Sequence, residues 1–486
     1  MNFDTIPLTL RTPGQYAEFD NSMAIQGLTI DATNVLVFGQ KLNSGTATAN
    51  QAVQVLSADH AAQLFGRGSL LHAMFATYKA NDETTKAFAM PLADDAAGVA
   101  ATGTFTITGT ATEAGTIAAY LGGKRVRAGI SVGDTANVAG AALAAAINAD
   151  LDLVVTAANA NGLVTLTARH KGAFMNGFDL RLNRALDEAV PAGLAIAVAN
   201  MSGGTANPEL AAALAAMGDT HYHHVVLPYT DSSSLAAVKA EADTRADGTH
   251  QVDMQVWAAA AGSHGTLTTL GNSMNSQWIS IMGADASPTP AYLWAAAYGA
   301  RAAYYLSNDA ARPLQTLVLA GVIAPDETSR FTRAERNLLL YDGIATFMVG
   351  TDGSVMIERA VTTFQTNTYN LPDASYLDSE TLATLSILRR TLRARIASRY
   401  PRHKLAADGT RFAMGQAVVT PSIMRGELID LARRWEELGW VEQVDDYKDK
   451  LIVEIDPNDP NRINALIPPN LVNQLRVFAG KIQFRL

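Results

Sequence analysis

The chain has 486 residues, of which 48% are hydrophobic and 17% charged, so it can bury cores in roughly two to four domains. Its formal net charge of −9 argues against wrapping nucleic acid or binding an anionic membrane, because both favour a basic surface. It has no cysteine, which excludes disulfides, thiolate metal sites and thiol nucleophiles. The start, MNFDTIPLTL, does not resemble a signal peptide, and no apolar run has transmembrane length. We therefore expect a soluble protein made in a reducing cytoplasm, without membrane insertion.

The first predicted element is a short strand at the N-terminus. Ile6, Leu8 and Leu10 alternate with other residues, which is the period of a half-buried strand. A proline within the run cannot donate a ladder hydrogen bond, so the strand must be short or lie at a sheet edge. Further along, residues 34–40 (NVLVFGQ) predict a buried strand and residues 64–80 predict a helix.

The residue composition and the predicted secondary structure change twice in the middle of the chain. Short Thr- and Val-rich strands between Gly and Asn turns predict an inserted, mostly β domain over residues 95–200, with one helix inside it. After it, Asn207 and Pro208 predict the cap and first position of a helix. Strands then alternate with helices expected at 232–246 and 287–305, and this alternation predicts an α/β domain.

The C-terminal region predicts an α+β unit. One helix should run from Asp378, as its cap, to Arg399, and a second should begin at Thr420 and Pro421 and end near Gly439. The first helix has an apolar stripe that should face a core. The residues of this stripe are Leu385, Leu388, Leu392 and Ile396.

The first of these helices also carries the most concentrated basic feature of the chain. Its arginines have two interpretations, which the sequence supports about equally. One is a solvated face with favourable positive charge near a helix C-terminus, and the other is a docking face for an acidic partner. The residues concerned are Arg389, Arg390, Arg393, Arg395 and Arg399.

The last residues again alternate polar and apolar side chains. Ile482, Phe484 and Leu486 are the apolar positions, and the pattern runs to the end of the chain without a polar tail. Such an apolar terminal strand is an aggregation hazard unless another strand pairs with it. Neither end of the chain has an obvious partner nearby in sequence, so the question is whether each joins its own sheet or that of another chain.

Three stretches resemble chemical sites, but each has a structural explanation that we favour. His221 and His223 in HYHH would share one face of a strand and could chelate zinc, but no third ligand has a diagnostic spacing. SHGT and GNSM resemble protease motifs, yet a single helix would separate His264 from Ser273 by roughly 13 Å, too far for proton transfer. The Gly-rich MSGGT lacks the remaining residues of a phosphate-binding loop. We therefore predict no catalytic, metal-binding or cofactor-binding residues, and no cofactor.

Several long stretches, in order along the chain, resemble the tail sheath proteins of contractile-tailed, Mu-like bacteriophages. They include NDAARPLQTLVLAGVIAP (308–325), GTDGSVMIERAVTTFQTN (350–367) and YLDSETLATLSILRR. The ending VEQVDDYKDKLIVEIDPNDPNRINALIPPNLVNQLRVFAGKIQFRL is similar too, as are SGGTANPEL and the opening IPLTLRTPGQYAEFD. The resemblance spans essentially the whole chain.

The resemblance implies a multidomain α+β fold. Its core would be a subtilisin-like α/β domain without protease activity, formed by residues 21–94 and 201–368. An outward-facing β-rich domain would be inserted at 95–200, and an α+β domain facing the tail tube would occupy 369–472. Residues 1–20 and 473–486 would be linking arms that exchange strands with neighbouring subunits, through Ile6, Leu8, Leu10, Ile482, Phe484 and Leu486.

The resemblance also implies a function. Copies would stack as sixfold rings around a tail tube, with baseplate and tail terminator proteins as further partners, and would contract to drive the tube through the host envelope. The protein would be a virion component assembled in the host cytoplasm, and some of the five arginines would contact the tube. A sheath from a phage-like bacteriocin or another contractile injection system is the alternative in the same class. A hydrolase or metal enzyme built on residues 201–368 is the alternative in a different class.

Overall fold

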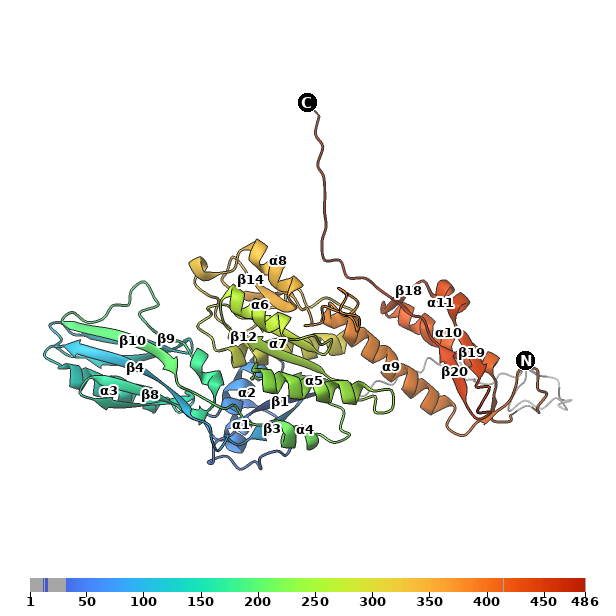
Figure 1. Cartoon of the computed structure of the whole chain (residues 1–486), viewed down its shortest axis with the longest axis horizontal. Coiled ribbons are helices and arrows are strands. Elements are labelled where there is room, and N and C mark those ends of the chain that lie inside the picture. The colour runs from blue at the N-terminus through green and yellow to red at the C-terminus, as the bar shows by residue number, and fades with distance from the viewer. Residues whose placement is uncertain (1–11, 13, 16–31, 414, 486) are drawn as a thin grey trace.

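Three regions lie along the long axis of the computed structural model, which describes residues 12, 14–15, 32–413 and 415–485 (Figure 1). A β-rich lobe forms one end, a large sheet with its helices lies in the middle, and an α+β unit forms the other end. The C-terminal segment leaves the body and projects away from it. The multidomain class of mixed α and β structure predicted from the sequence is therefore confirmed.

The central sheet has eight strands, in the order β15-β14-β13-β12-β11-β1-β3-β2. The six inner strands are parallel, and the strand at each edge is antiparallel to its neighbour. The inner strands are almost continuously buried, as expected for parallel strands covered on both faces. The strands are β1 (Asn34–Gln40), β2 (Val53–Gln54), β3 (Lys86–Leu92), β11 (His224–Val226), β12 (Gln255–Ala260), β13 (Ile279–Gly283), β14 (Ile344–Val349) and β15 (Val355–Arg359).

Helix α7 (Ala291–Asn308) packs on the middle of this sheet, against β11, β12 and β13. Small side chains allow the close approach: a Cβ added to Gly299 would lie 2.5 Å from the Val226 side chain. Helix α7 begins after Pro290, later than the sequence predicted, because Ser287 instead accepts a hydrogen bond from the Trp294 indole at 3.0 Å. The other helices of the region are α1 (Ala58–Phe65), α2 (Leu70–Asn81), α4 (Ala211–Ala215), α5 (Ser232–Ala246), α6 (His264–Asn272) and α8 (Arg333–Tyr341).

Two predictions in this region are wrong. The helix expected over 64–80 is divided between α1 and α2, because Gly66 and Gly68 adopt φ angles of 87° and 80°, which end a helix. Asn207 does not cap a helix, since α4 begins at Ala211. The Asn207 side chain instead donates to Asp231 at 2.6 Å and so joins two loops.

The β-rich lobe contains two antiparallel sheets, one α-helix, α3 (Ala136–Ala149), which Thr135 caps, and a short 3-10 helix (Ala173–Gly177). The chain enters and leaves the lobe at one place, because Val99 and Thr205 form a β-bridge with two backbone hydrogen bonds of 3.2 Å. One sheet has the strand order β10-β4-β8-β7 and the other β6-β5-β9. The strands are β4 (Ala100–Gly109), β5 (Gly115–Leu121), β6 (Lys124–Ile130), β7 (Val155–Ala160), β8 (Leu163–Lys171), β9 (Leu180–Leu182) and β10 (Leu194–Ser202).

The third region is built on two long helices, α9 (Ser379–Arg399) and α10 (Pro421–Glu437). Thr420 caps α10 and Pro421 opens it, as predicted. In the stripe predicted for α9, Leu388 is buried, whereas Leu385, Leu392 and Ile396 are half-buried. The remaining elements are α11 (Val444–Lys450), β16 (Lys404–Leu405), β17 (Val418–Val419), β18 (Val441–Glu442), β19 (Ile452–Ile455), β20 (Ile463–Leu466) and β21 (Asn470–Leu471).

Candidate assembly site at the base of the C-terminal segment

The segment that follows β21 exposes an unusual amount of apolar surface. Phe478, Ile482 and Phe484 are 88%, 94% and 77% exposed, and residues 472–485 belong to no strand. Such a row of large apolar side chains is unfavourable in water, and exposed apolar surface of this kind is typical of interaction sites. Two of the predicted linking residues, Ile482 and Phe484, therefore lie where a neighbouring chain can reach them. Ile6, Leu8, Leu10 and Leu486 lie outside the described residues.

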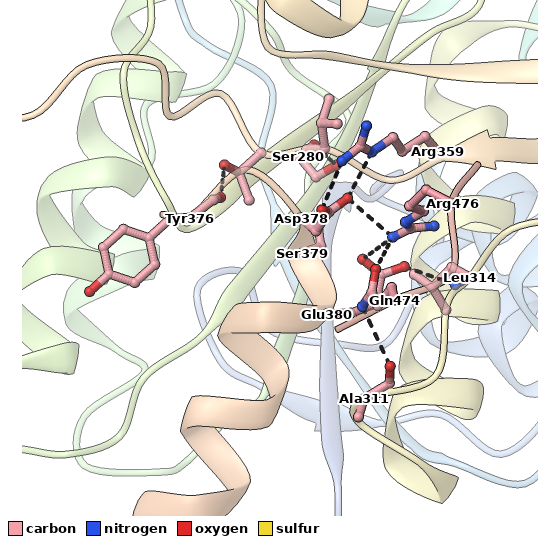
Figure 2. Close-up of polar contacts among 12 residues, drawn as sticks. Ser280, Ala311, Leu314, Arg359, Tyr376, Asp378, Ser379, Glu380, Gln474 and Arg476 are labelled. Carbon is pink, nitrogen blue, oxygen red and sulfur yellow. Dashed lines mark hydrogen bonds and ion pairs between the residues drawn. The ribbon is translucent and has the colours of Figure 1, made fainter. Parts of the chain in front are cut away.

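The base of this segment, unlike its end, is fixed to the rest of the protein (Figure 2). The Val472 amide donates to the Trp440 carbonyl at 3.2 Å, and the Gln474 side chain donates to the Ala311 carbonyl at 3.4 Å. Arg476 Nη2 lies 3.1 Å from a carboxylate oxygen of Asp378 and 3.1 Å from one of Glu380. The segment thus has a fixed base, which we call the stem (residues 472–476), and a free apolar end.

The two acidic residues come from the start of α9, where negative charge interacts favourably with the helix dipole. Glu380 is completely buried, and one of its oxygens accepts a hydrogen bond of 2.8 Å from the Leu314 amide. Burial raises the pKa of Glu380, and the positive charge of Arg476 opposes this rise. Asp378 occupies the cap position but does not cap the helix as predicted, because its carboxylate binds the Arg359 guanidinium through two hydrogen bonds of 2.9 Å.

The arginines further along α9 form ion pairs and hydrogen bonds with other parts of the chain. Arg389 lies 2.5 Å from Asp253, and Arg393 donates to the Gln251 carbonyl at 3.0 Å, both in the loop that leads into β12. Toward the end of the helix, the paired residues are Arg395 with Glu427 and Asp430, and Arg399 with Glu427.

The sequence reasoning missed these acidic partners, since they lie far from the arginines in sequence. Arg390 lines a small cavity together with His223, His224 and Asp253. Of the five arginines predicted as tube contacts, Arg393 and Arg399 have exposed side chains. Contact of these five arginines with the tube stays a prediction.

Of the histidines in the HYHH motif, His223 and His224 are buried and His221 is half-buried, and each has a hydrogen-bond partner. The His221 and His223 rings stack at 3.9 Å, His223 Nδ1 accepts from the Asn34 amide at 3.1 Å, and His224 Nδ1 accepts from the Trp257 indole at 3.1 Å. Burial lowers the pKa of His223 far below its usual value and that of His224 to about 3. Within the described ranges, no group of three or more His, Cys, Asp or Glu side chains is placed to share a metal ion.

The protease-like motifs do not form a catalytic arrangement. His264 opens α6 and Ser273 follows its end, as the sequence indicated. The Ser273 hydroxyl donates to the Leu270 carbonyl of its own helix at 2.7 Å, and His264 Nε2 lies 3.2 Å from the Glu335 carbonyl.

Among the residues that the structure describes, no helix is both long and apolar enough to span a membrane.

Comparison with known proteins identifies the family. The model of the phage tail sheath protein central domain matches residues 203–363, and that of the phage tail sheath C-terminal domain matches residues 372–485. A Mu-like prophage FluMu tail sheath protein from Haemophilus influenzae is 41% identical over 484 residues, which cover 100% of this chain and 99% of that protein. The chain belongs to the phage tail sheath family. It is thus related to structural subunits of contractile tails.

Several solved structures are similar to this sheath protein at low sequence identity. A sheath tail protein from Desulfitobacterium hafniense has a TM-score of 0.48 at 14% identity, covering 94% of this chain and 100% of that one. A sheath tail protein from Listeria innocua has a TM-score of 0.49 at 11% identity, covering 92% and 93%. The contracted helical sheath of the anti-feeding prophage has a TM-score of 0.47 at 11% identity, covering 97% and 98%.

The two matched family domains show in which part of this sheath protein the candidate assembly site lies. The central-domain match begins after β10 and contains β11 to β15 of the central sheet, whereas the β-rich lobe lies before it. The C-terminal match contains α9, the stem and the exposed apolar end. The candidate site therefore lies within the C-terminal sheath domain, at its contact with the central domain.

Proposed function

We propose that this sheath protein polymerises as stacked sixfold rings around a tail tube and contracts to drive the tube through the host cell envelope for genome delivery. The observation that carries the proposal is the exposed apolar end of the C-terminal segment, which projects from the body on a fixed stem (Figure 1). Such a segment suits strand addition to a neighbouring subunit. The N-terminal arm, with Ile6, Leu8 and Leu10, serves as a second link.

Each link is strong enough to hold while other contacts change. About five ladder hydrogen bonds at roughly 1 kcal/mol each, and about three large apolar side chains at roughly 2 kcal/mol each, give on the order of 10 kcal/mol before ordering entropy is subtracted. Rigid-body contacts between subunits can therefore slide and re-form during contraction. The sequence contains no P-loop motif, so we propose that the energy is stored in a metastable extended lattice.

The remaining assignments follow from the same proposal. The central sheet with its helices, from residues 21–94 and 201–368, is the subtilisin-like core without protease function. The lobe at 95–200 faces outward, and the α+β unit at 369–472 faces the tube. Baseplate and tail terminator proteins bound the polymer, which forms in the host cytoplasm and becomes part of the virion. A bacteriocin-type particle would use the same subunit mechanics.

The proposal is tested by replacing the apolar face of the link. In Ile482→Ser with Phe484→Ser, we expect a folded, soluble subunit that no longer forms long hollow sheaths by electron microscopy. The matched control is Lys481→Ser with Gln483→Ser, which changes the alternate, polar face and should leave sheaths of normal length. If the apolar-face variant assembles as well as the control, strand donation by this end of the chain is wrong.

A further inference from the structure

The stem of the C-terminal segment is attached to the subunit at two separate places. Its first residue, Val472, bonds to Trp440, which lies in the α+β unit, and it follows a ladder of only two residue pairs between β18 and β21. Its last residue, Arg476, binds Asp378 and Glu380, next to the central sheet. A pull on the free end reaches Arg476 before it reaches the ladder.

Arg476 is held in a buried cluster of alternating charges. Its side chain is only 12% exposed and lies between the carboxylates of Asp378 and Glu380. On its other side, Asp378 binds Arg359, which is the last residue of β15 in the central sheet (Figure 2). Removing Arg476 from the cluster would leave the completely buried Glu380 carboxylate without its cation, and an uncompensated buried charge is strongly unfavourable.

Beyond Arg476 the restraints end. Within the described residues, the side chains from Val477 to Arg485 take part in no hydrogen bond or ion pair, and Ala479 and Gly480 have little or no side chain to hold them. Gly480 also leaves the backbone free to adopt many conformations. The boundary between the fixed and the free part of the segment therefore falls directly after Arg476.

We propose that Arg476 is the anchor through which tension in the link enters the subunit, and that residues 477–480 are the pivot about which the link turns. The force then passes into the start of α9 and, through Asp378 and Arg359, into β15, so it enters where the α+β unit meets the central sheet. Arg476 is a positioning residue in this scheme, since the neighbouring subunit contacts the apolar end and not the anchor. The inference rests on the proposed function of the link.

The test uses spin labels, which the absence of native cysteine makes site-specific. One label is attached at Leu475→Cys, an exposed position in the stem, and one at Gln483→Cys, on the polar face of the link. In the unassembled subunit we expect a restricted label at 475 and a mobile one at 483. Arg476→Met should shorten the correlation time at 475 roughly threefold or more and leave 483 unchanged.

Controls separate the anchor from general destabilisation. Arg312→Met removes an exposed arginine from the loop that the stem contacts and should change neither label. Because Arg476→Met can destabilise the fold through Glu380, the double variant Arg476→Met with Glu380→Gln removes both charges, and it should still mobilise 475. If 475 is as mobile as 483 in the wild type, or stays restricted in both variants, the anchor assignment is wrong.

The same labels distinguish failure of this inference from failure of the proposed function. On sheath assembly, the label at 483 should become immobile in the wild type, because a neighbour then covers the link. A label at 483 that remains mobile in assembled sheaths would overturn the link itself. An immobile 483 together with a 475 label that does not respond to Arg476→Met would retain the link and overturn only the anchor.

Discussion

The Arg389 guanidinium on α9 lies 2.5 Å from the Asp253 carboxylate, and the pair joins the α+β unit to the loop that precedes β12. Asp253 is buried, whereas Arg389 is half-buried and also donates to the Ala246 carbonyl at 2.8 Å. Ser386, one turn earlier on α9, donates to the same carboxylate. One buried carboxylate thus accepts hydrogen bonds from two residues of α9 and helps to hold this helix against the central sheet.

Removing one partner of this pair should destabilise the subunit. Arg389→Met leaves the buried Asp253 charge without its cation, and we expect a loss of about 2–3 kcal/mol in the free energy of unfolding, measured with denaturant. The control Arg393→Met removes an exposed arginine from the same helix and should cost less than about 1 kcal/mol. Adding Asp253→Asn to Arg389→Met should cost less than the sum of the single changes, and strict additivity would mean that the pair is not coupled.

The same pair predicts a pH dependence. Burial acts to raise the pKa of Asp253, but the Arg389 charge and the hydrogen bonds from Ser386 and Arg389 outweigh it, so the pKa lies below its usual value. A carboxyl whose pKa is lowered by folding stabilises the protein above its unfolded pKa of about 3.9, and this stabilisation is lost as the pH falls through the folded pKa. The stability difference between wild type and Asp253→Asn should thus be largest near neutral pH and shrink below pH ~4. A constant difference across this range would contradict the assignment.

Two glycines with similar φ angles, Gly68 between α1 and α2 and Gly203 after β10, should respond differently to substitution by alanine. A Cβ on Gly68 would lie 2.6 Å from the Leu151 carbonyl oxygen of the lobe, at a φ of 80°. Gly203 has a similar φ of 79°, but a Cβ there would meet nothing within 4 Å. Gly203→Ala should cost about 1 kcal/mol from backbone strain alone, and Gly68→Ala about 1–3 kcal/mol more, measured by thermal unfolding. Equal effects would show that the lobe gives way at this contact.

The paired entry and exit of the lobe predict that it can be removed. Replacing residues 100–204 with a short linker joins Val99 to Thr205, which already lie side by side. The cut exposes Tyr229 and Tyr292, against which Phe174 of the lobe packs at 5.7 and 6.0 Å between ring centroids. We therefore expect a shortened protein that unfolds cooperatively at a lower temperature than wild type. Insolubility with every linker length tried would contradict an independently folded lobe.

Contact between α9 and the tube is best tested at Arg393. Reversing Arg389 would also break the pair with Asp253, whereas Arg393 is exposed and its contact in the chain is with the Gln251 carbonyl. We expect Arg393→Glu to weaken assembly on purified tubes at low salt, and to differ less from wild type at moderate salt, because exposed ion pairs are screened. Arg402→Glu, at a nearby exposed position, is the control. Assembly equal to wild type at both salt concentrations would leave α9 without a role in tube binding.

Local patterns predicted local structure well. The strand at 34–40, the helix at 232–246 and the cap at Thr420 follow from periodicity and capping chemistry, which act over a few residues. The pairing of Arg389 with Asp253 was not predictable, because it joins residues 136 positions apart and depends on how α9 packs on the sheet. Asp378 was expected to cap α9, but two arginines, one of them in the C-terminal segment, compete for its carboxylate. The linking arms and the domain limits stay predictions.

The two edges of the central sheet are poor templates for adding another strand. The outer side of β15 is covered by residues 316–319, through backbone hydrogen bonds of 2.8 to 3.0 Å that join Thr316, Leu317 and Leu319 to this strand. The other edge strand, β2, contains only two residues. Because exposed sheet edges promote indiscriminate pairing between chains, one covered edge and one very short edge leave little backbone with which a second chain could pair. The largest sheet of this sheath protein is thereby protected from irregular aggregation between subunits.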